Sequence, residues 1–219
     1  MVITLQATFF RLFEWIRVFL RYYSLEMRFV WLDLLLASQY LFRSPHRISR
    51  AFLKERGASN IYQFGETPLT TLDRIARQCQ ISAKDTVYEL GCGSARGCFW
   101  LHTFVKCQVV GIDYLPDFIV KAKKVKRWAR LAKIDFIQED MLNVDLSSAT
   151  VIYLYGTCLE DSVIEKLILR LKSIQSGTKV ITVSYPLTEY CKGETFRVEK
   201  SFTARFPWGK AEVFLNIRN

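Results

Sequence analysis

Residues 86–97 combine the residue types that a nucleotide-like ligand requires at the end of a strand. The mostly apolar segment Thr86–Leu90 contains Glu89 and runs directly into a turn with Gly91 and Gly93. Glycines in such a turn let the backbone bend sharply and approach a ligand that a Cβ would exclude. Free N–H groups at the start of the following helix would point at the same place. The spacing therefore predicts a parallel strand that passes into a helix above a bound ligand.

Glu89 selects among the ligands that use such a turn. A carboxylate two positions before the first glycine would repel the phosphates of a dinucleotide. S-adenosylmethionine has no phosphate and carries an ammonium group and a sulfonium, so the same carboxylate attracts it. We interpret the turn as a site for this methyl donor. A dinucleotide site and a turn with a structural role only are the alternatives.

A second acidic residue follows the next predicted strand. The segment Cys107–Ile112 ends at Asp113, 16 positions after Gly97. A carboxylate at this place can accept hydrogen bonds from both hydroxyls of a ribose, and the spacing recurs in ribose-binding α/β folds. Asp113 is therefore a candidate ribose contact, with an incidental surface aspartate as the alternative.

These residues resemble the first motif of the class I, seven-stranded, S-adenosylmethionine-dependent methyltransferases, in which an acidic residue is followed after one position by Gly-x-Gly-x-Gly. The motif reads Glu89-Leu90-Gly91-Cys92-Gly93-Ser94-Ala95, so that Ala95 replaces the third glycine. The resemblance covers about residues 62–219. It implies S-adenosyl-L-methionine as the cofactor, with Glu89, Gly91 and Gly93 at its amino-acid end, Asp113 at the ribose, and Asp140 with Met141 at the adenine.

A further segment, Phe64-Gly65-Glu66-Thr67, is similar to the aromatic-Gly-Glu-Thr segment of the non-SET lysine methyltransferases. This partial likeness implies that Phe64 and Thr67 contact the methionine end of the donor. The local pattern gives Thr67 another role, because a threonine before Pro68 predicts the N-cap of a helix over residues 69–79.

The remaining pattern predicts an α/β fold of the doubly wound, Rossmann-like type over residues 57–219. Strands joined by helices form a parallel sheet, whereas residues 196–206 and 212–217, joined by a short turn, can pair only as antiparallel neighbours. An antiparallel pair that closes a parallel sheet is typical of these methyltransferases. We expect seven strands, the other five at residues 86–90, 107–113, 134–138, 151–155 and 179–184.

The end of the fourth predicted strand is where the methyl group would meet its acceptor. Tyr155 and, after the fifth strand, Tyr185 are candidate catalytic residues, because their rings can face a sulfonium or an ammonium. Core packing is the alternative for both. The chain lacks the Asn/Asp-Pro-Pro-aromatic motif that nucleobase amine methylases carry here, which argues against an adenine-N6 enzyme.

The likeness at residues 64–69 favours a protein lysine as the acceptor. A narrow apolar pocket would keep its amine neutral by desolvation, and Tyr153, Tyr155, Tyr185 and Phe64 could supply that pocket. His46 is expected at the surface, and no histidine is placed to act as a base. The alternatives are an RNA or small-molecule methyltransferase and a non-catalytic, membrane-associated module that binds the donor.

Residues 1–56 form a basic, amphipathic N-terminal helical segment, with residues 30–42 as a second helix or a continuation. Nine Arg and Lys against four Asp and Glu supply half of the chain's net charge of +10. One side of the first helix is apolar, which predicts binding to an anionic membrane surface or packing on the domain or on a twin subunit. The polar side carries Arg11, Glu14, Arg17, Arg21 and Arg28, and the apolar side carries Phe9, Phe13, Ile16, Leu20 and Tyr23.

Composition limits the remaining possibilities. Six scattered cysteines without a Cys-x-x-Cys pair and only two histidines give no disulfide framework and no zinc site. A cytoplasmic protein, peripheral to a membrane through residues 1–42, is the resulting expectation. A predicted helix over residues 116–133 carries seven Lys and Arg, which keeps nucleic acid open as a partner beside a merely solvated helix face.

Overall fold

A seven-stranded sheet forms the centre of the molecule. The computed structural model describes residues 2–58, 60–191 and 195–219. The strands are β1 (Thr86–Leu90), β2 (Gln108–Asp113), β3 (Ile134–Gln138), β4 (Val151–Leu154), β5 (Lys179–Val183), β6 (Phe196–Phe206) and β7 (Gly209–Arg218). Their order is β3-β2-β1-β4-β5-β7-β6, with β7 antiparallel to β5 and β6 and the other pairs parallel. This is the predicted Rossmann-like sheet with its C-terminal antiparallel hairpin.

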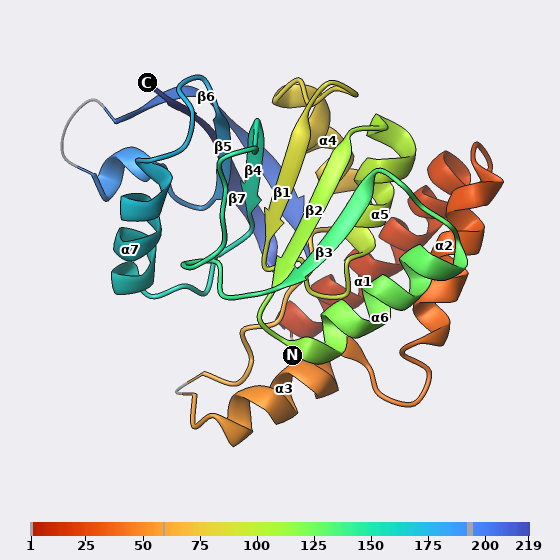
Figure 1. The fold of residues 1–219 in the computed structure, drawn as a ribbon. Helices are drawn as coiled ribbons and strands as arrows, with labels where there is room; N and C mark the ends of the chain where they lie inside the picture. Colours follow the sequence, from red (N-terminus) through yellow and green to blue (C-terminus); the bar gives the residue numbers. More distant parts are fainter. Residues whose placement is uncertain (1, 59, 192–194) are drawn as a thin grey trace.

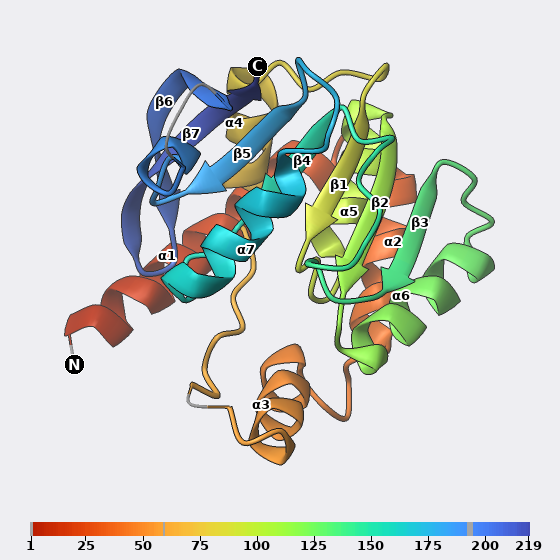
Figure 2. The same cartoon turned by 60° about the vertical axis from the view of Figure 1, so that its left-hand side comes forward.

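Helices cover both faces of this sheet. They are α1 (Val2–Val18), α2 (Met27–Ser38), α3 (Pro45–Glu55), α4 (Leu69–Gln78), α5 (Arg96–Trp100), α6 (Pro116–Trp128) and α7 (Asp161–Leu171), with π-helical turns η1 (Phe19–Tyr23) and η2 (Leu101–Val105) and the short 3-10 helix η3 (Leu187–Glu189). Figure 1 shows α7 on one face and α4, α5 and α6 on the other, while α3 lies beyond the carboxyl ends of β1 to β3. Figure 2 shows α7 in front of the sheet and α1 behind it.

Side chains of the central strands alternate between two cores, as the period of a strand requires. Val87 and Val109 pack with the helices on the side of α4 to α6, and Tyr88 and Val110 pack on the side of α7. Four of the five residues of β1, all but Thr86, are buried. The glycine turn that follows β1 is therefore fixed by strands on both sides.

Two helices differ from the predicted bounds for local reasons. Helix α2 begins at Met27 as a separate element, because the Glu26 side chain accepts a hydrogen bond from Arg28 N and caps it. Helix α6 ends at Trp128, since Arg130 adopts the left-handed φ of 51°. No helix in the described ranges is both long and apolar enough to cross a bilayer.

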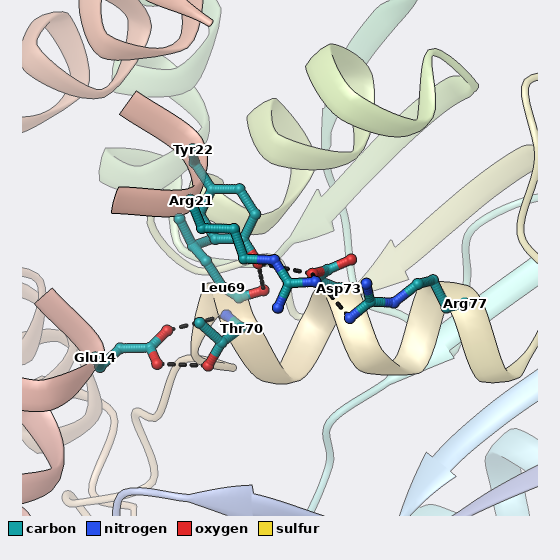
Figure 3. A network of polar contacts seen from close by, with 7 residues as sticks. All are labelled: Glu14, Arg21, Tyr22, Leu69, Thr70, Asp73 and Arg77. Carbon is teal, nitrogen blue, oxygen red and sulfur yellow. Dashed lines mark hydrogen bonds and ion pairs between the residues drawn. The ribbon is translucent and has the colours of Figure 1, made fainter. Parts of the chain in front are cut away.

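The N-terminal helices pack on the domain, and α1 does so through its polar side. Helix α1 contacts α4, and α2 contacts α5 and α6. Figure 3 shows the junction, in which the Arg21 guanidinium lies 3.0 Å from an Asp73 carboxylate oxygen that also accepts from Tyr22. Four of the five residues predicted to form the apolar side point outward, with Phe13 56% and Leu20 66% exposed, whereas Tyr23 packs against the core and donates to Asp33. The predicted packing of the N-terminal helices on the domain is therefore present. The side of α1 with most of its large apolar residues is the side that faces away from the domain.

The prediction that Thr67 caps α4 is wrong. The helix begins at Leu69 with no side-chain cap from Pro68, and the Thr67 hydroxyl is 2.5 Å from that of Tyr153. Glu14 of α1 supplies the cap instead, accepting from Thr70 N at 3.0 Å and from Thr70 Oγ1 at 2.5 Å (Figure 3). A carboxylate at a helix N-terminus also meets the positive end of its dipole.

Replacing Glu14 with alanine should therefore lower the free energy of unfolding by about 1–2 kcal/mol, the usual value of a lost N-cap. The loss of stability is measured as a lower urea midpoint of unfolding with an unchanged m-value. Glu55→Ala on α3 is the matched control, because Glu55 is exposed and its change should stay within about 0.5 kcal/mol. Equal midpoints for the two variants would contradict the capping role.

Candidate active site

Two neighbouring cavities lie at the carboxyl ends of β1 and β4. The larger has a volume of about 460 Å³ and the smaller about 120 Å³. Four residues line both, namely Phe64, Gly65, Gly91 and Tyr155. Ligands of open α/β sheets bind at this edge, so the cavities stand where the sequence places its ligand.

The glycine turn opens toward these cavities. Gly91 adopts φ +75°, and a Cβ added there would meet no atom within 4 Å, so its backbone faces open space. Gly93 adopts φ +52°, and a Cβ there would lie 2.9 Å from the Phe64 ring. Ala95, in the place of the third glycine, is buried and also left-handed at φ 67°. A non-glycine residue in this region costs roughly 1 kcal/mol, which the packed surroundings of the turn offset.

Glu89 is a buried carboxylate that lines the larger cavity. Its Oε2 accepts a hydrogen bond from the Cys98 thiol at 3.0 Å, and in the described part of the chain it makes no ion pair. Burial is the main cause that raises the pKa of Glu89, to about 7. A buried acid without a cation is poised to accept one, and the ammonium of S-adenosylmethionine is such a cation.

Asp113 lies at the floor of the smaller cavity. Its Oδ2 accepts from Gly93 N and its Oδ1 from Leu115 N, both at 2.9 Å, so the carboxylate is oriented while each oxygen keeps a further lone pair. Burial raises its pKa above the usual range. Met141 lines this cavity as well, whereas Asp140 lines neither cavity, because its Oδ1 accepts from Leu142 N at 2.9 Å in an exposed turn.

Phe64 and Thr67 both reach the larger cavity. Phe64 stands where the two cavities meet, with its ring centroid 5.3 Å from that of Phe118 and 4.9 Å from the imidazole of His46. His46 is exposed, as predicted, and it also lines the larger cavity, which the sequence pattern did not indicate. Desolvation lowers the pKa of His46, which keeps the imidazole neutral. No local sequence motif predicts that His46 lines the cavity, because only the tertiary fold brings α3 to the site.

Tyr155 and the β6–β7 turn form an aromatic wall of the larger cavity. The indole of Trp208 donates to the Tyr155 hydroxyl at 2.7 Å. The Phe206 ring is stacked on both, with centroids 5.3 Å from Trp208 and 5.5 Å from Tyr155. Tyr155 is thus at the site as predicted, and Trp208 is a site residue that the sequence pattern assigned only to a turn.

The other two tyrosines of the predicted pocket do not reach it. Tyr185 lines neither cavity, because it packs in the core beneath α7 with its hydroxyl close to Gly156. The packing of Tyr185 in the core contradicts the prediction that it is a catalytic residue. Tyr153 is 2% exposed and serves as the hydrogen-bond partner of Thr67. Both are core residues, which for Tyr185 is the alternative that the sequence left open.

Helices α1 and α2 complete the larger cavity. Arg96 lines it and is held by Asp33 of α2 through two hydrogen bonds, from Nε at 2.8 Å and from Nη2 at 2.6 Å. The inner side of α1 forms the outer wall with both apolar and charged residues, namely Ala7, Phe10, Arg11, Glu14, Trp15 and Val18. The segment predicted as a separate N-terminal appendage therefore contributes directly to the site.

These groups fit S-adenosylmethionine. Glu89 would hold the amino-acid end, Asp113 the ribose, Met141 the adenine side, and Phe64, Thr67 and Tyr155 the region of the sulfonium. When bound, this cofactor supplies a methyl group on a positively charged sulfur. The chain's own part is to align the acceptor and exclude water. The fold and the site together define a class I S-adenosylmethionine-dependent methyltransferase.

Comparison with known proteins agrees with this class. A family model described as a methyltransferase domain matches residues 81–203, more than half of the chain, and the chain therefore belongs to this methyltransferase family. The comparison with curated proteins gives no match.

Solved structures show the same fold. An RNA methyltransferase from Salinibacter ruber, in complex with S-adenosyl-L-homocysteine, is 26% identical, with a TM-score of 0.56 over 69% of this chain and 93% of that one. TrmN from Thermus thermophilus is 12% identical, with a TM-score of 0.62 over 80% of this chain and 53% of its own. Magnesium protoporphyrin IX methyltransferase from Synechocystis, with bound S-adenosylmethionine, is 12% identical, with a TM-score of 0.55 over 82% and 99%. The last two likenesses concern the fold alone.

Proposed function

We propose that this methyltransferase transfers the methyl group to the ε-amine of a lysine in a protein partner. The observation that carries the proposal is the aromatic wall of the larger cavity, which Tyr155 and Trp208 line while both stack on the buried ring of Phe206. Stacked rings attract an ammonium group through their faces, and a long, thin side chain suits a cavity of about 460 Å³ that the donor shares.

Acidic groups on the cavity wall support a cationic acceptor. Glu14 and Glu66 line the cavity in addition to Glu89, and of the two arginines on the same wall, Arg11 and Arg96, the second is already paired with Asp33. A lysine must lose a proton before its nitrogen can attack the methyl group. The neutral imidazole of His46 and the carboxylate of Glu66 are two groups on this wall that can accept that proton, so the site does not depend on desolvation alone.

An RNA acceptor is the second candidate. It is favoured by the likeness to the RNA methyltransferase from Salinibacter ruber and by the net charge of +10. Three of the five basic side chains of α6 favour it less, since Lys126 pairs with Asp135, and Lys121 and Lys124 lie over the rings of Tyr40 and Trp128. Lysines with partners inside the chain are less available to phosphates.

Transfer of label from methyl-tritiated S-adenosylmethionine into a lysate of the source organism tests the acceptor. We expect the label to be sensitive to protease, resistant to ribonuclease, and recovered as methyl-lysine after acid hydrolysis. Trp208→Ala should lower the labelling rate about fivefold, because the cation–π contribution of one partly exposed ring is about 1 kcal/mol. Binding of S-adenosylhomocysteine should be unchanged.

Trp128→Ala is the matched control, because Trp128 is 48% exposed against 49% for Trp208 and lies on α6. It should label at the normal rate. Label found only in ribonuclease-sensitive material would replace the lysine proposal with the RNA candidate, and label only in small metabolites would overturn both. Each of these outcomes leaves the methyltransferase class intact.

A further inference from the structure

The outer side of the N-terminal helices is far more apolar than the rest of the surface. Among the described residues, thirteen of the twenty exposed large apolar side chains lie between Phe9 and Phe42. Single exposed apolar residues are ordinary, but a contiguous patch of them marks an interaction site. We call ten of these the outer apolar face: Phe9, Leu12, Phe13, Ile16, Phe19, Leu20, Leu25, Met27, Trp31 and Leu34.

The orientation of α1 explains why this face is free. An amphipathic helix on a soluble domain normally buries its apolar stripe and exposes its charges. Helix α1 instead leaves Phe9, Phe13 and Ile16 exposed together with Arg17. Its inner side is held by Glu14, which caps α4, and Arg21 of the adjoining η1 turn pairs with Asp73 (Figure 3). This arrangement exposes apolar area to water at a cost that a partner on the outer side would remove.

The charges around the face are mostly positive. Glu14 caps α4 and Asp33 pairs with Arg96, whereas Glu26 caps α2 and forms no ion pair among the described residues. The exposed cations Arg17 and Arg28 form none of the ion pairs found among the described residues. Aromatic and aliphatic side chains bordered by free arginines are the composition of a helix that lies in a lipid interface.

We propose that the outer apolar face binds the surface of an anionic lipid bilayer, with α1 and α2 lying in the plane of the headgroups. A second copy of the chain fits less well. A two-fold dimer would bring the same face of both copies together, so that Arg17 and Arg28 would approach their counterparts with Glu26 as the one acid on the face that could pair with them. An anionic membrane complements both the apolar residues and the arginines.

Binding there would also fix the position of the active site. The inner side of α1 lines the larger cavity with Phe10, Arg11 and Glu14, and an α-helix with its side chains is about 10 Å across. The cavity would thus stand roughly one helix diameter from the headgroups. This inference concerns where the enzyme acts and holds for either acceptor class.

Co-sedimentation of the full chain with vesicles tests the proposal. Vesicles of phosphatidylcholine with about one-third phosphatidylglycerol should bind the protein, less strongly as salt is added, and phosphatidylcholine alone should bind it more weakly. Leu20→Gln should lower the partition coefficient about tenfold, since the contribution of one buried leucine is about one power of ten or more. Arg17→Gln with Arg28→Gln should reduce binding to the anionic vesicles only.

Leu169→Gln is the matched control, because Leu169 is 64% exposed against 66% for Leu20 and lies on α7 on the other face of the sheet. It should bind vesicles normally. Deletion of the helices is not a usable test, because it would also remove the cap of α4 and a wall of the cavity. A thermal shift with S-adenosylhomocysteine verifies that each point variant is folded.

Three results would overturn the proposal. One is the absence of binding to the anionic vesicles, and another is equal loss in Leu20→Gln and Leu169→Gln. The third is a stable dimer in sedimentation that Leu20→Gln dissociates, without vesicle binding, which would assign the face to a second copy. None of these measurements depends on methyl transfer, so they are independent of the proposed acceptor.

Discussion

Replacing Glu89 with glutamine is expected to lower the affinity for S-adenosylhomocysteine about 100-fold or more. Glu89 is buried at the end of β1 and has no cationic partner in the described part of the protein. The ligand's ammonium would be that partner, and the neutral amide cannot compensate its charge. Isothermal titration of the folded variant measures the loss.

The pH dependence of binding gives a second readout of the same residue. The folded-state pKa of Glu89 is about 7, and an ammonium binds the ionised carboxylate. Affinity in the native protein should therefore rise about tenfold between about pH 6 and about pH 8 and should become flat in Glu89→Gln. Without ligand the sign reverses, because a raised carboxyl pKa means that the folded state binds the extra proton. This group's contribution to stability is then lost as pH rises toward 7.

Asp135→Asn is a control for the loss of a carboxylate, since Asp135 is exposed on β3 and pairs only with Lys126. It should bind S-adenosylhomocysteine normally. Unchanged affinity in Glu89→Gln, or binding that strengthens as pH falls, would remove Glu89 from the donor site.

Replacing Asp33 with asparagine is expected to lower the free energy of unfolding by about 3 kcal/mol. Asp33 is 9% exposed and holds the Arg96 guanidinium through two hydrogen bonds, and it also accepts from the Tyr23 hydroxyl. Removing one member of a mostly buried pair leaves the other charge without compensation. Urea unfolding should show the lower midpoint, and the stability of Asp33→Leu with Arg96→Met should recover in part, because no charge then remains.

The exposed pair of Lys126 and Asp135 calibrates this expectation. Asp135→Asn should cost less than about 1 kcal/mol, because solvent screens a surface ion pair. If Asp33→Asn unfolds at the same urea concentration as Asp135→Asn, the Asp33–Arg96 pair does not link α2 to the site.

The sheet could be predicted from the sequence because the local residue pattern and the burial of the strands agree. The apolar strand ending in Glu89, the left-handed glycines and Asp113 at the end of β2 are each read from neighbouring residues, and all three lie at the cavities. The roles of residues that depend on tertiary contacts could not be predicted from neighbouring residues. Thr67 has the local pattern of an N-cap, yet Glu14, 56 positions before Thr70 in the chain, provides the cap.

Dependence on tertiary contacts also explains why the predicted and observed residues differ on the acceptor side of the site. His46 and Trp208 come to the cavity from a connecting helix and a hairpin turn, and no spacing rule relates them to the glycine motif. Tyr185 follows a strand as catalytic residues often do, but packing decides its direction, and it points into the core. For α1, periodicity predicted the two faces, while only the contacts with Thr70 and Asp73 determine which one turns inward.

Phe64 between the two cavities makes the methyl donor a bivalent ligand. Its nucleoside and its amino acid would occupy separate compartments, the smaller containing Asp113 and the larger containing Glu89. When two weak modules are joined by a short linker, the second binds at an effective concentration in the millimolar range. The affinity for the intact donor then arises largely from this chelate effect. Adenosine and methionine as separate molecules would be weak competitors, and the enzyme would tolerate both in the cell.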